Sequence, residues 1–298
     1  MKAFFRKNIL AIFSFLVLIV WLTINVFQYI DQHNVQVRMY NQYKEKYQEL
    51  CQTDKTFCNM KKPEYPDTMT VFYQIMFHES LYNLQVFAPI FIFIPCIWSF
   101  HKKMKSGYYK NELTRMSYKK FIQNSFKEVF KNTWILLGFV IVLFMISYIL
   151  SGNFDYEATK LAYGEYLSTF DWNYIEIWPI FMVVYLIVIW LHSVFYVNLA
   201  LIFSKKNSNL FIVIILSYLS FMGIEFILTL IGAFFARILD IHYVTEKLNL
   251  FNIWGYKQSF PLPFVILYAL ALVCITGIIV YFLYRNKEEV ILVNEERT

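Results

Sequence analysis

The sequence predicts an all-α integral membrane protein with six transmembrane helices, and three observations lead to this fold class. Hydrophobic residues make up 58% of the 298 positions and charged residues only 16%, which is too little polar surface to cover a water-soluble fold of this length. Six apolar runs reach the length of about 20 residues that a helix needs to cross a bilayer. None of these runs alternates between polar and apolar residues as the strands of a membrane barrel do.

The six runs are distributed along the whole chain, so we treat residues 1–298 as a single transmembrane domain. The runs cover residues 9–30, 81–100, 133–150, 177–203, 210–236 and 264–284. The first run is too long for the apolar part of a signal peptide, and no typical cleavage site follows it, so we expect it to remain as a span. Two of the segments between spans carry further patterns: the loop 31–80 and the loop 101–132.

The distribution of lysine and arginine predicts the orientation of the chain. With a cytoplasmic N-terminus, 17 of the 27 Lys and Arg residues fall in cytoplasmic segments, nine of them in the loop 101–132. The loop 151–176 on the other side carries five acidic residues and a single Lys. Because positive charge marks the cytoplasmic side, we expect both termini inside. Abundant Ile, Asn and Lys with few glycines are the usage expected of an AT-rich bacterial genome, and we expect the protein in the bacterial plasma membrane. The charge follows topology and forms no nucleic-acid-binding stripe.

The sequence lacks the motifs of common nucleotide-binding and metal-dependent enzymes. None of its eight glycines is followed by lysine, so there is no phosphate-binding loop, and no His-Glu-x-x-His is present. We therefore expect no catalytic residue, no metal and no cofactor bound by this chain. Cys51 and Cys58 both fall in the predicted outer loop, where they form either a short-loop disulfide or two free thiols.

The outer loop 31–80 begins with a helical pattern. Val37, Tyr40, Tyr47 and Leu50 recur at helical spacing, which predicts that the first span continues outward as an amphipathic helix. Two interpretations of this loop stay open. It is either a lid that packs on the outer ends of the spans, or a segment that contacts a substrate or an extracellular peptide.

The inner loop 101–132 predicts two short amphipathic helices. In the first, Tyr109, Leu113 and Met116 form one apolar stripe after Gly107. A helix of two turns is too short to be stable alone, so we expect lipid or another protein to receive this stripe. The second helix begins after Ser117, and we expect it to lie on the inner leaflet. Its apolar residues are Phe121, Ile122, Phe126, Val129 and Phe130.

With these features the chain resembles the membrane subunits of ABC-2-type ABC transporters. The resemblance covers the six spans with cytoplasmic termini and the segment SGYYKNELTRMSYKKF, which is similar to the coupling helix of that family. The matching positions are Gly107, Leu113, Arg115, Ser117 and Phe121. In that family the coupling helix docks into a cleft of a separate ATPase subunit.

The resemblance implies a function and partners. It implies a permease subunit that exports or removes a peptide, drug or lipid-like substrate, with ATP and Mg bound only by the ATPase subunit. A second permease subunit, identical or different, would complete the path through the membrane. The residues expected to contact the ATPase are Gly107, Tyr109, Leu113, Arg115 and Met116. The alternative is a membrane-embedded immunity or sensor protein that binds an extracellular peptide through the loop 31–80.

Polar residues inside the predicted spans are candidates for the translocation path. Glu225 is the only acidic residue within a span, and ionisable groups in a membrane are often functional. His192 falls at a comparable height, so we expect the two residues to meet between the fourth and fifth spans. Asn83 and Gln85 near the outer end of the second span are further candidates. For Glu225 and His192, the alternative is a hydrogen-bonded clasp between two helices.

Overall fold

The protein is described by a computed structural model at residues 2–53, 67–76, 79–154, 178–205, 207, 209–239 and 262–286. These ranges consist mainly of helices, and no strand is found among them. Six of the described helices are long and apolar enough to cross a membrane, so the chain is a multi-pass membrane protein. They are α1 (Lys2–Thr53), α3 (Glu79–Lys105), α6 (Trp134–Ser151), α9 (Trp178–Ser204), α10 (Leu210–Leu239) and α13 (Leu262–Arg285).

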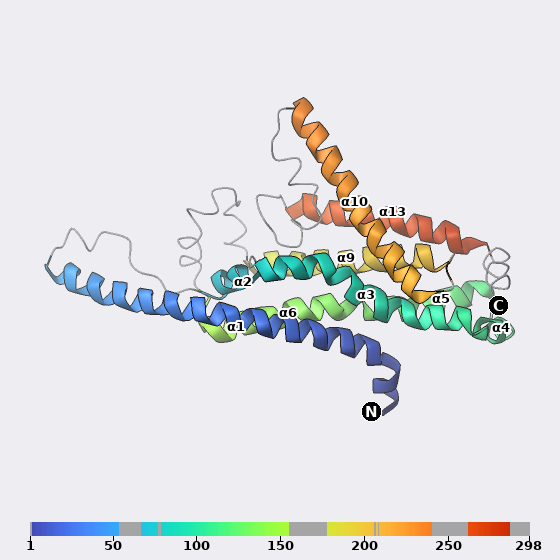
Figure 1. The fold of residues 1–298 in the computed structure, drawn as a ribbon, viewed down its shortest axis with the longest axis horizontal. Helices are drawn as coiled ribbons and strands as arrows, with labels where there is room; N and C mark the ends of the chain where they lie inside the picture. Colours follow the sequence, from blue (N-terminus) through green and yellow to red (C-terminus); the bar gives the residue numbers. More distant parts are fainter. Residues whose placement is uncertain are drawn as a thin grey trace.

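The remaining described elements are short and lie at the two ends of the bundle (Figure 1). Helix α2 covers Thr68–Met76 at the end where α6 finishes, and Thr68 donates its backbone hydrogen bond to the carbonyl of Asn153 at 3.0 Å. At the opposite end lie α4 (Tyr108–Leu113), α5 (Tyr118–Phe130) and the 3-10 turn η2 (Lys131–Thr133). The segment with two predicted amphipathic helices therefore occupies one end of the molecule.

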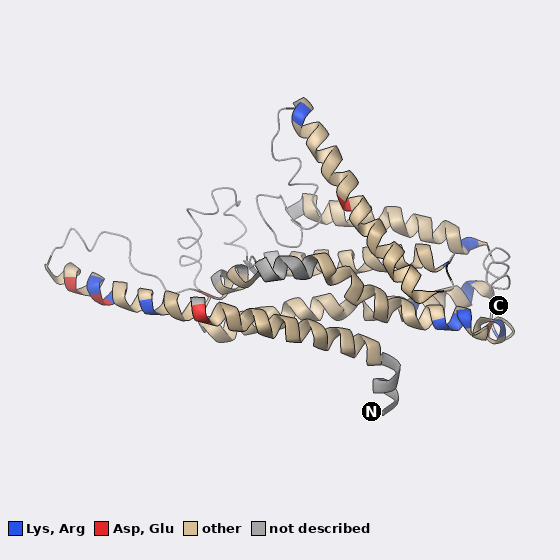
Figure 2. Ribbon diagram, in the orientation of Figure 1, with Lys and Arg blue, Asp and Glu red and all other residues tan. Residues whose placement is uncertain are grey.

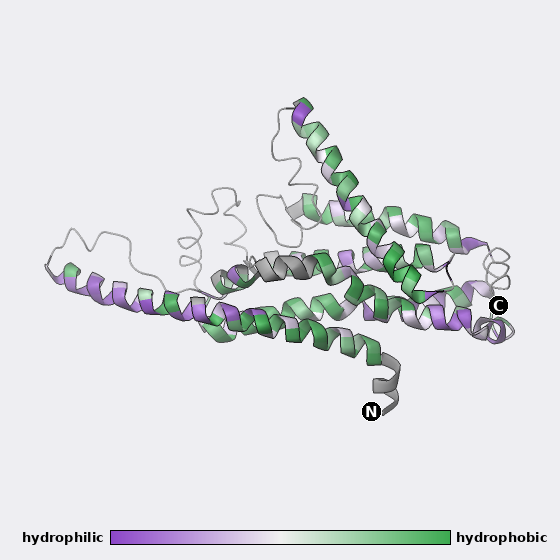
Figure 3. Ribbon diagram, viewed as in Figure 1, coloured by the Kyte–Doolittle hydropathy of each residue, from purple (hydrophilic) through white to green (hydrophobic). Residues whose placement is uncertain are grey.

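Helix α1 is much longer than a bilayer requires. It has 52 residues, or about 78 Å at 1.5 Å per residue, and its far end extends past every other described helix (Figure 1). That projecting part is hydrophilic and charged, whereas the spans are hydrophobic (Figures 2 and 3). The predicted outward continuation of the first span is therefore present as one uninterrupted helix.

Helix α9 is the centre of the bundle. It contacts α13, α3, α10 and α6, and 67% of its most apolar stretch is buried inside the protein, against 22% for α10 and for α13. Small and β-branched side chains allow this close approach, and Val188, Val197 and Ala200 are fully buried. The other spans are arranged around α9 and expose apolar side chains on their outer faces.

Helix α10 leans away from the rest of the bundle. Its first turns lie beside α3 and α9, while its last turns stand apart from the other described helices (Figure 1). Apolar side chains remain exposed on that distal half, including Phe226, Leu230, Phe234 and Ile238. In a membrane such side chains face lipid or another subunit without the cost that they would have in water.

Two prolines lie inside α3, at Pro89 and Pro95. A proline inside a helix removes one backbone donor and disturbs the hydrogen-bond ladder. The carbonyl of Pro95 accepts a hydrogen bond from the side-chain amide of Asn132 in η2, at 3.0 Å. The irregular part of α3 is thereby tied to the turn that leads into α6.

Candidate functional site

The candidate site is the end of the bundle that carries α4. Lysine and arginine residues are concentrated there, around the ends of α3, α5 and α13 (Figure 2). The chain reverses between α3 and α4 at Gly107, whose φ of 69° lies in the left-handed region. A side chain at this φ would strain the backbone, which gives a local reason for a glycine at the start of α4.

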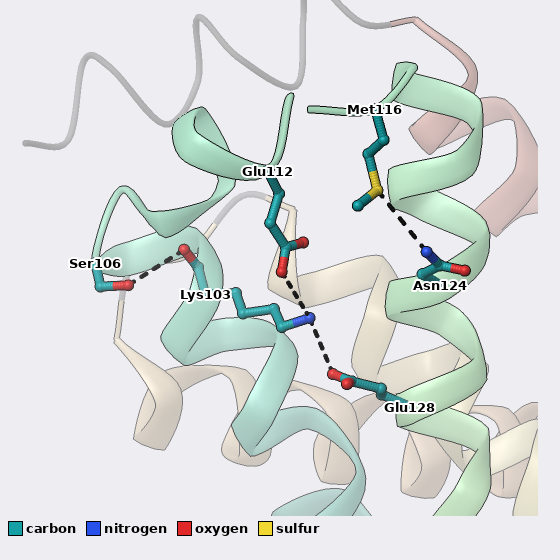
Figure 4. A network of polar contacts seen from close by, with 6 residues as sticks. All are labelled: Lys103, Ser106, Glu112, Met116, Asn124 and Glu128. Carbon is teal, nitrogen blue, oxygen red and sulfur yellow. Dashed lines mark hydrogen bonds and ion pairs between the residues drawn. The ribbon is translucent and has the colours of Figure 1, made fainter. Parts of the chain in front are cut away.

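A lysine bridges the three helices that meet at this end (Figure 4). The ammonium nitrogen of Lys103 in α3 lies 3.0 Å from a carboxylate oxygen of Glu128 in α5 and 3.5 Å from one of Glu112 in α4. All three side chains are largely shielded from solvent. Partial burial strengthens the attraction relative to an exposed ion pair, so this bridge fixes α4 against α3 and α5.

The apolar stripe of α4 packs against the chain itself. Tyr109 is only 1% exposed, and Leu113 and Met116 pack against the buried core of the protein. The amide of Asn124 in α5 donates to the sulfur of Met116 at 3.8 Å. We expected lipid or another protein to receive this stripe, but α3 and α5 lie side by side and provide the apolar surface.

What α4 and its following turn leave exposed is mostly polar. Tyr108, Asn111, Thr114 and Arg115 face outward. Of the residues expected to contact an ATPase, Arg115 is therefore exposed and Tyr109 is buried. Gly107, Leu113 and Met116 are intermediate. A partner that approaches this end meets the outward residues of α4 rather than its apolar stripe.

The apolar side of helix α5 also packs against other helices of the same chain. Phe121 and Val129 are buried, and Ile122, Phe126 and Phe130 pack against the core. The aromatic ring of Phe126 clusters with those of Phe100 in α3 and Tyr284 in α13, with ring centres 6.2 Å and 5.4 Å away. The neighbouring helices α3 and α13 thus cover the apolar side of α5, and its expected position at the inner leaflet stays a prediction.

Two tyrosines extend this packing to the central helix. The hydroxyl of Tyr118 in α5 donates to the backbone carbonyl of Tyr284 in α13 at 2.8 Å. The hydroxyl of Tyr284 in turn donates to the carbonyl of Leu201 in α9 at 3.0 Å. Together with the Lys103 bridge, these bonds connect α4 and α5 to the ends of three spans.

The turn η2 forms a second junction further along the bundle. The indole nitrogen of Trp190 in α9 donates to the hydroxyl of Thr133 at 3.2 Å, while Asn132 bonds to Pro95 of α3 as described above. This hydrogen bond adds a connection between α9 and η2. Both ends of α5 are therefore held by polar contacts to the spans.

Glu225 lies buried on α10, with 6% of the residue exposed. The hydroxyl of Thr229, one turn later, donates to one of its carboxyl oxygens at 3.3 Å. The carboxyl group is also within electrostatic range of Tyr268 in α13. Glu225 is therefore a buried acid in the middle of α10, near the point from which α10 leans outward.

His192 is buried in the central helix, with 1% of the residue exposed. Its Nδ1 atom lies 2.8 Å from the backbone carbonyl of Val188, and because a carbonyl only accepts, Nδ1 must carry the hydrogen. Among the described residues, Nε2 has no hydrogen-bond partner. The contacts described for His192, with Val188 and the ring of Tyr196, differ from those of Glu225, and the expected meeting of the two residues stays a prediction.

A polar contact between side chains of two spans was not predicted. The side-chain amide of Asn198 in α9 donates to the hydroxyl of Thr276 in α13 at 3.1 Å, in the described pair of helices with the most extensive contact. An asparagine within a predicted span was the available signal. Lys103 was also missed as a bridge, although Glu112 and Glu128 are the only acidic residues of the segment 101–132.

The other predicted sites are only partly covered by the described residues. Asn83 and Gln85 lie in α3, and their side chains fall outside the described part. Cys51, near the end of α1, is disulfide-bonded, while its predicted partner Cys58 lies outside the described residues. Within the described ranges, no group of three His, Cys, Asp or Glu residues is arranged to hold a metal ion.

Comparison of the chain with protein-family models, with curated proteins and with solved structures found no match.

Proposed function

We propose that the chain is the permease subunit of an ABC transporter in a bacterial plasma membrane. With a second permease subunit it would form the path for export or removal of a peptide, drug or lipid-like substrate. A separate ATPase subunit, which binds ATP and Mg, would supply the energy. The observation that supports this proposal is the way in which α4, at one end of the bundle, is attached to the spans.

The attachment suits the transmission of a mechanical displacement. A push on the exposed side of α4 reaches α3 and α5 through Lys103, which holds carboxylates of both α4 and α5. From α5 it continues to α13 and α9 through the hydroxyl groups of Tyr118 and Tyr284. Tightly packed helices move together as a rigid body, because a packed interface does not deform continuously.

The polar groups inside the spans support a translocation path. Glu225 is buried on α10 and accepts a hydrogen bond from Thr229, and Nε2 of His192 is an acceptor that meets no donor among the described residues. A substrate or water molecule with a hydrogen-bond donor satisfies such a group, since an unpaired buried acceptor is costly. In this proposal both residues serve the path and have no catalytic role.

The proposal is tested by affinity purification of the full chain from a mild detergent. We expect an ATPase to co-purify with the wild type, and its yield to fall at least tenfold with Arg115→Glu, which reverses an exposed charge beside α4. Arg38→Glu is the matched control, because Arg38 is exposed on the projecting part of α1. Leu113→Asp is a poorer probe, because Leu113 packs against the core and its loss would disturb the fold.

Two results would contradict the proposal. Absence of any ATPase from the wild-type sample would remove the energy source on which transport depends. Equal recovery of the ATPase with Arg115→Glu and with Arg38→Glu would show that the exposed side of α4 is not the contact.

A second candidate is an immunity or sensor protein, and the projecting part of α1 favours it. Val35, Met39 and Tyr43 recur every four residues there and are 46–57% exposed, so they form an apolar stripe on a long helix. Such a stripe suits a peptide that binds as a helix or strand along it. Replacement of all three by serine would abolish peptide capture while leaving any ATPase association intact.

A further inference from the structure

The outward side of α5 carries a series of exposed polar and basic side chains. The buried side of α5 faces α3 and α13. Because residues three or four positions apart share one face of a helix, the remaining residues form an opposite, outward side. The exposed residues on that side are Lys119, Lys120, Gln123, Asn124 and Lys127. We call these residues the α5 basic face.

Among the described residues at this end of the bundle, few acids balance the positive charge of the α5 basic face. The segment 101–132 contains only two carboxylates, Glu112 and Glu128, and both bind the inward-facing Lys103. Lys102, Lys105 and Arg115 add exposed positive charge at the same end of the bundle. The result is a concentration of cations that attracts an anionic partner.

The height of the α5 basic face along the bundle identifies the kind of partner. Tyr118, at the start of α5, lies level with the end of α13, where it bonds to Tyr284, so the α5 basic face begins at the height of the last turns of that span. In that same last part of α13, Tyr281 and Phe282 are each 61% exposed. Exposed aromatic residues at this height mark the zone where lipid headgroups meet hydrocarbon.

We propose that the α5 basic face binds the phosphate headgroups of anionic phospholipids. Long lysine side chains reach along a helix and hold their ammonium groups at the level of the headgroups, and each one near an anionic membrane surface contributes favourably to binding. The charge distribution of the chain predicts that this is the cytoplasmic leaflet. The binding does not depend on the transport function, and it would fix the height of the α4 end relative to the membrane.

Native mass spectrometry of the full chain in a neutral detergent measures the binding of phospholipid directly. The two probes are phosphatidylglycerol and phosphatidylcholine with the same acyl chains, so that only the headgroup differs. We expect wild type to retain phosphatidylglycerol in preference to phosphatidylcholine. Lys119→Gln/Lys120→Gln/Lys127→Gln should lower the affinity for phosphatidylglycerol more than tenfold, and Lys127→Gln alone about fivefold.

The control variant Arg38→Gln/Lys44→Gln/Lys46→Gln removes the same charge from exposed positions on the projecting part of α1. It should retain phosphatidylglycerol as wild type does. Equal retention of the two lipids by wild type would overturn the proposal, and so would equal affinities in the two triple variants. If the α5 variant kept its lipid but lost a co-purifying ATPase, the face would be a protein contact and the proposal would also be overturned. The single variant Lys127→Gln decides the case if the triple variant fails to fold.

Discussion

The two ends of the bundle are held together in different ways. At the α4 end, an ion bridge and a series of hydrogen bonds connect α3, α4, α5, α9 and α13. Toward the opposite end, α10 leans out (Figure 1) and exposes apolar side chains along its last turns. This difference suggests that the α4 end moves as one body, while rearrangement of the spans takes place around α10.

The largest expected effect on stability comes from the buried residue of α4. Tyr109→Ala should destabilise the protein by about 3 kcal/mol, because it removes a fully buried aromatic side chain and leaves a cavity. Tyr108→Ala, at the exposed neighbouring position, should cost less than about 0.5 kcal/mol. Thermal unfolding in detergent measures both. A similar cost for the two variants would show that α4 is not packed as described.

A further variant at the same position separates packing from hydrogen bonding. The hydroxyl of Tyr109 is buried and has no hydrogen-bond partner among the described residues. Tyr109→Phe should therefore leave stability unchanged or raise it by up to about 1 kcal/mol, since it removes an unsatisfied polar group without leaving a cavity. A loss as large as that of Tyr109→Ala in the same assay would reveal an essential bond from this hydroxyl.

The ion bridge should contribute less than the buried tyrosine. Lys103→Gln leaves two carboxylates facing each other without their cation. We expect a loss of stability of about 1–2 kcal/mol, which is between the values for an exposed ion pair and for a fully buried one. A double-mutant cycle with Glu112→Gln isolates the coupling between α3 and α4. If the effects of the two substitutions were simply additive, Lys103 would not hold α4.

The turn before α4 should have a smaller effect again. Gly107→Ala should destabilise by about 1 kcal/mol, because φ is 69° although the added methyl group meets no atom within 4 Å. Gly223, inside α10, has the same free space but no such φ, so Gly223→Ala should be neutral or slightly stabilising. The denaturation midpoint should therefore fall for Gly107→Ala, and for Gly223→Ala it should stay the same or rise.

A substitution in the outward-leaning helix α10 should affect function, and it should have the smallest effect on stability. Glu225→Gln keeps an acceptor for Thr229 and removes the charge, so assembly should be preserved while transport is impaired. Transport into inverted vesicles, with binding of the ATPase as the control, measures the two separately. Unchanged transport would leave Glu225 with a structural role only.

Much of the fold was predictable because membrane spans are specified locally. Apolar length alone predicted six spans, and the helical spacing of Val37 and Tyr40 predicted the continuation of α1 beyond the bilayer. The surface on which an amphipathic helix packs, however, is formed by residues distant in the sequence. The stripe of Tyr109 and Leu113 predicted that α4 needs a receiving surface, but only the packing of α3 beside α5 shows that the chain itself provides it.

The candidate site was predicted in its residue types more than in its contacts. Glu225 and His192 were found because ionisable groups in spans are rare. Their contacts depend on how each helix is rotated, which hydrophobicity does not specify when a span is apolar on all sides. The bridge from Lys103 to Glu112 and Glu128 was hidden for a related reason, since a lysine in a basic segment is first attributed to topology.

The central claim is that α4 is held to the spans, and amide hydrogen exchange of the full chain tests it most directly. A free helix of six residues would exchange rapidly, whereas the amides of Thr114 and Met116, which bond to the carbonyls of Lys110 and Glu112, should be protected in the wild type. Lys103→Gln should accelerate their exchange and leave the amides of α6 unchanged. Rapid exchange of α4 in the wild type, or no change with Lys103→Gln, would contradict the account.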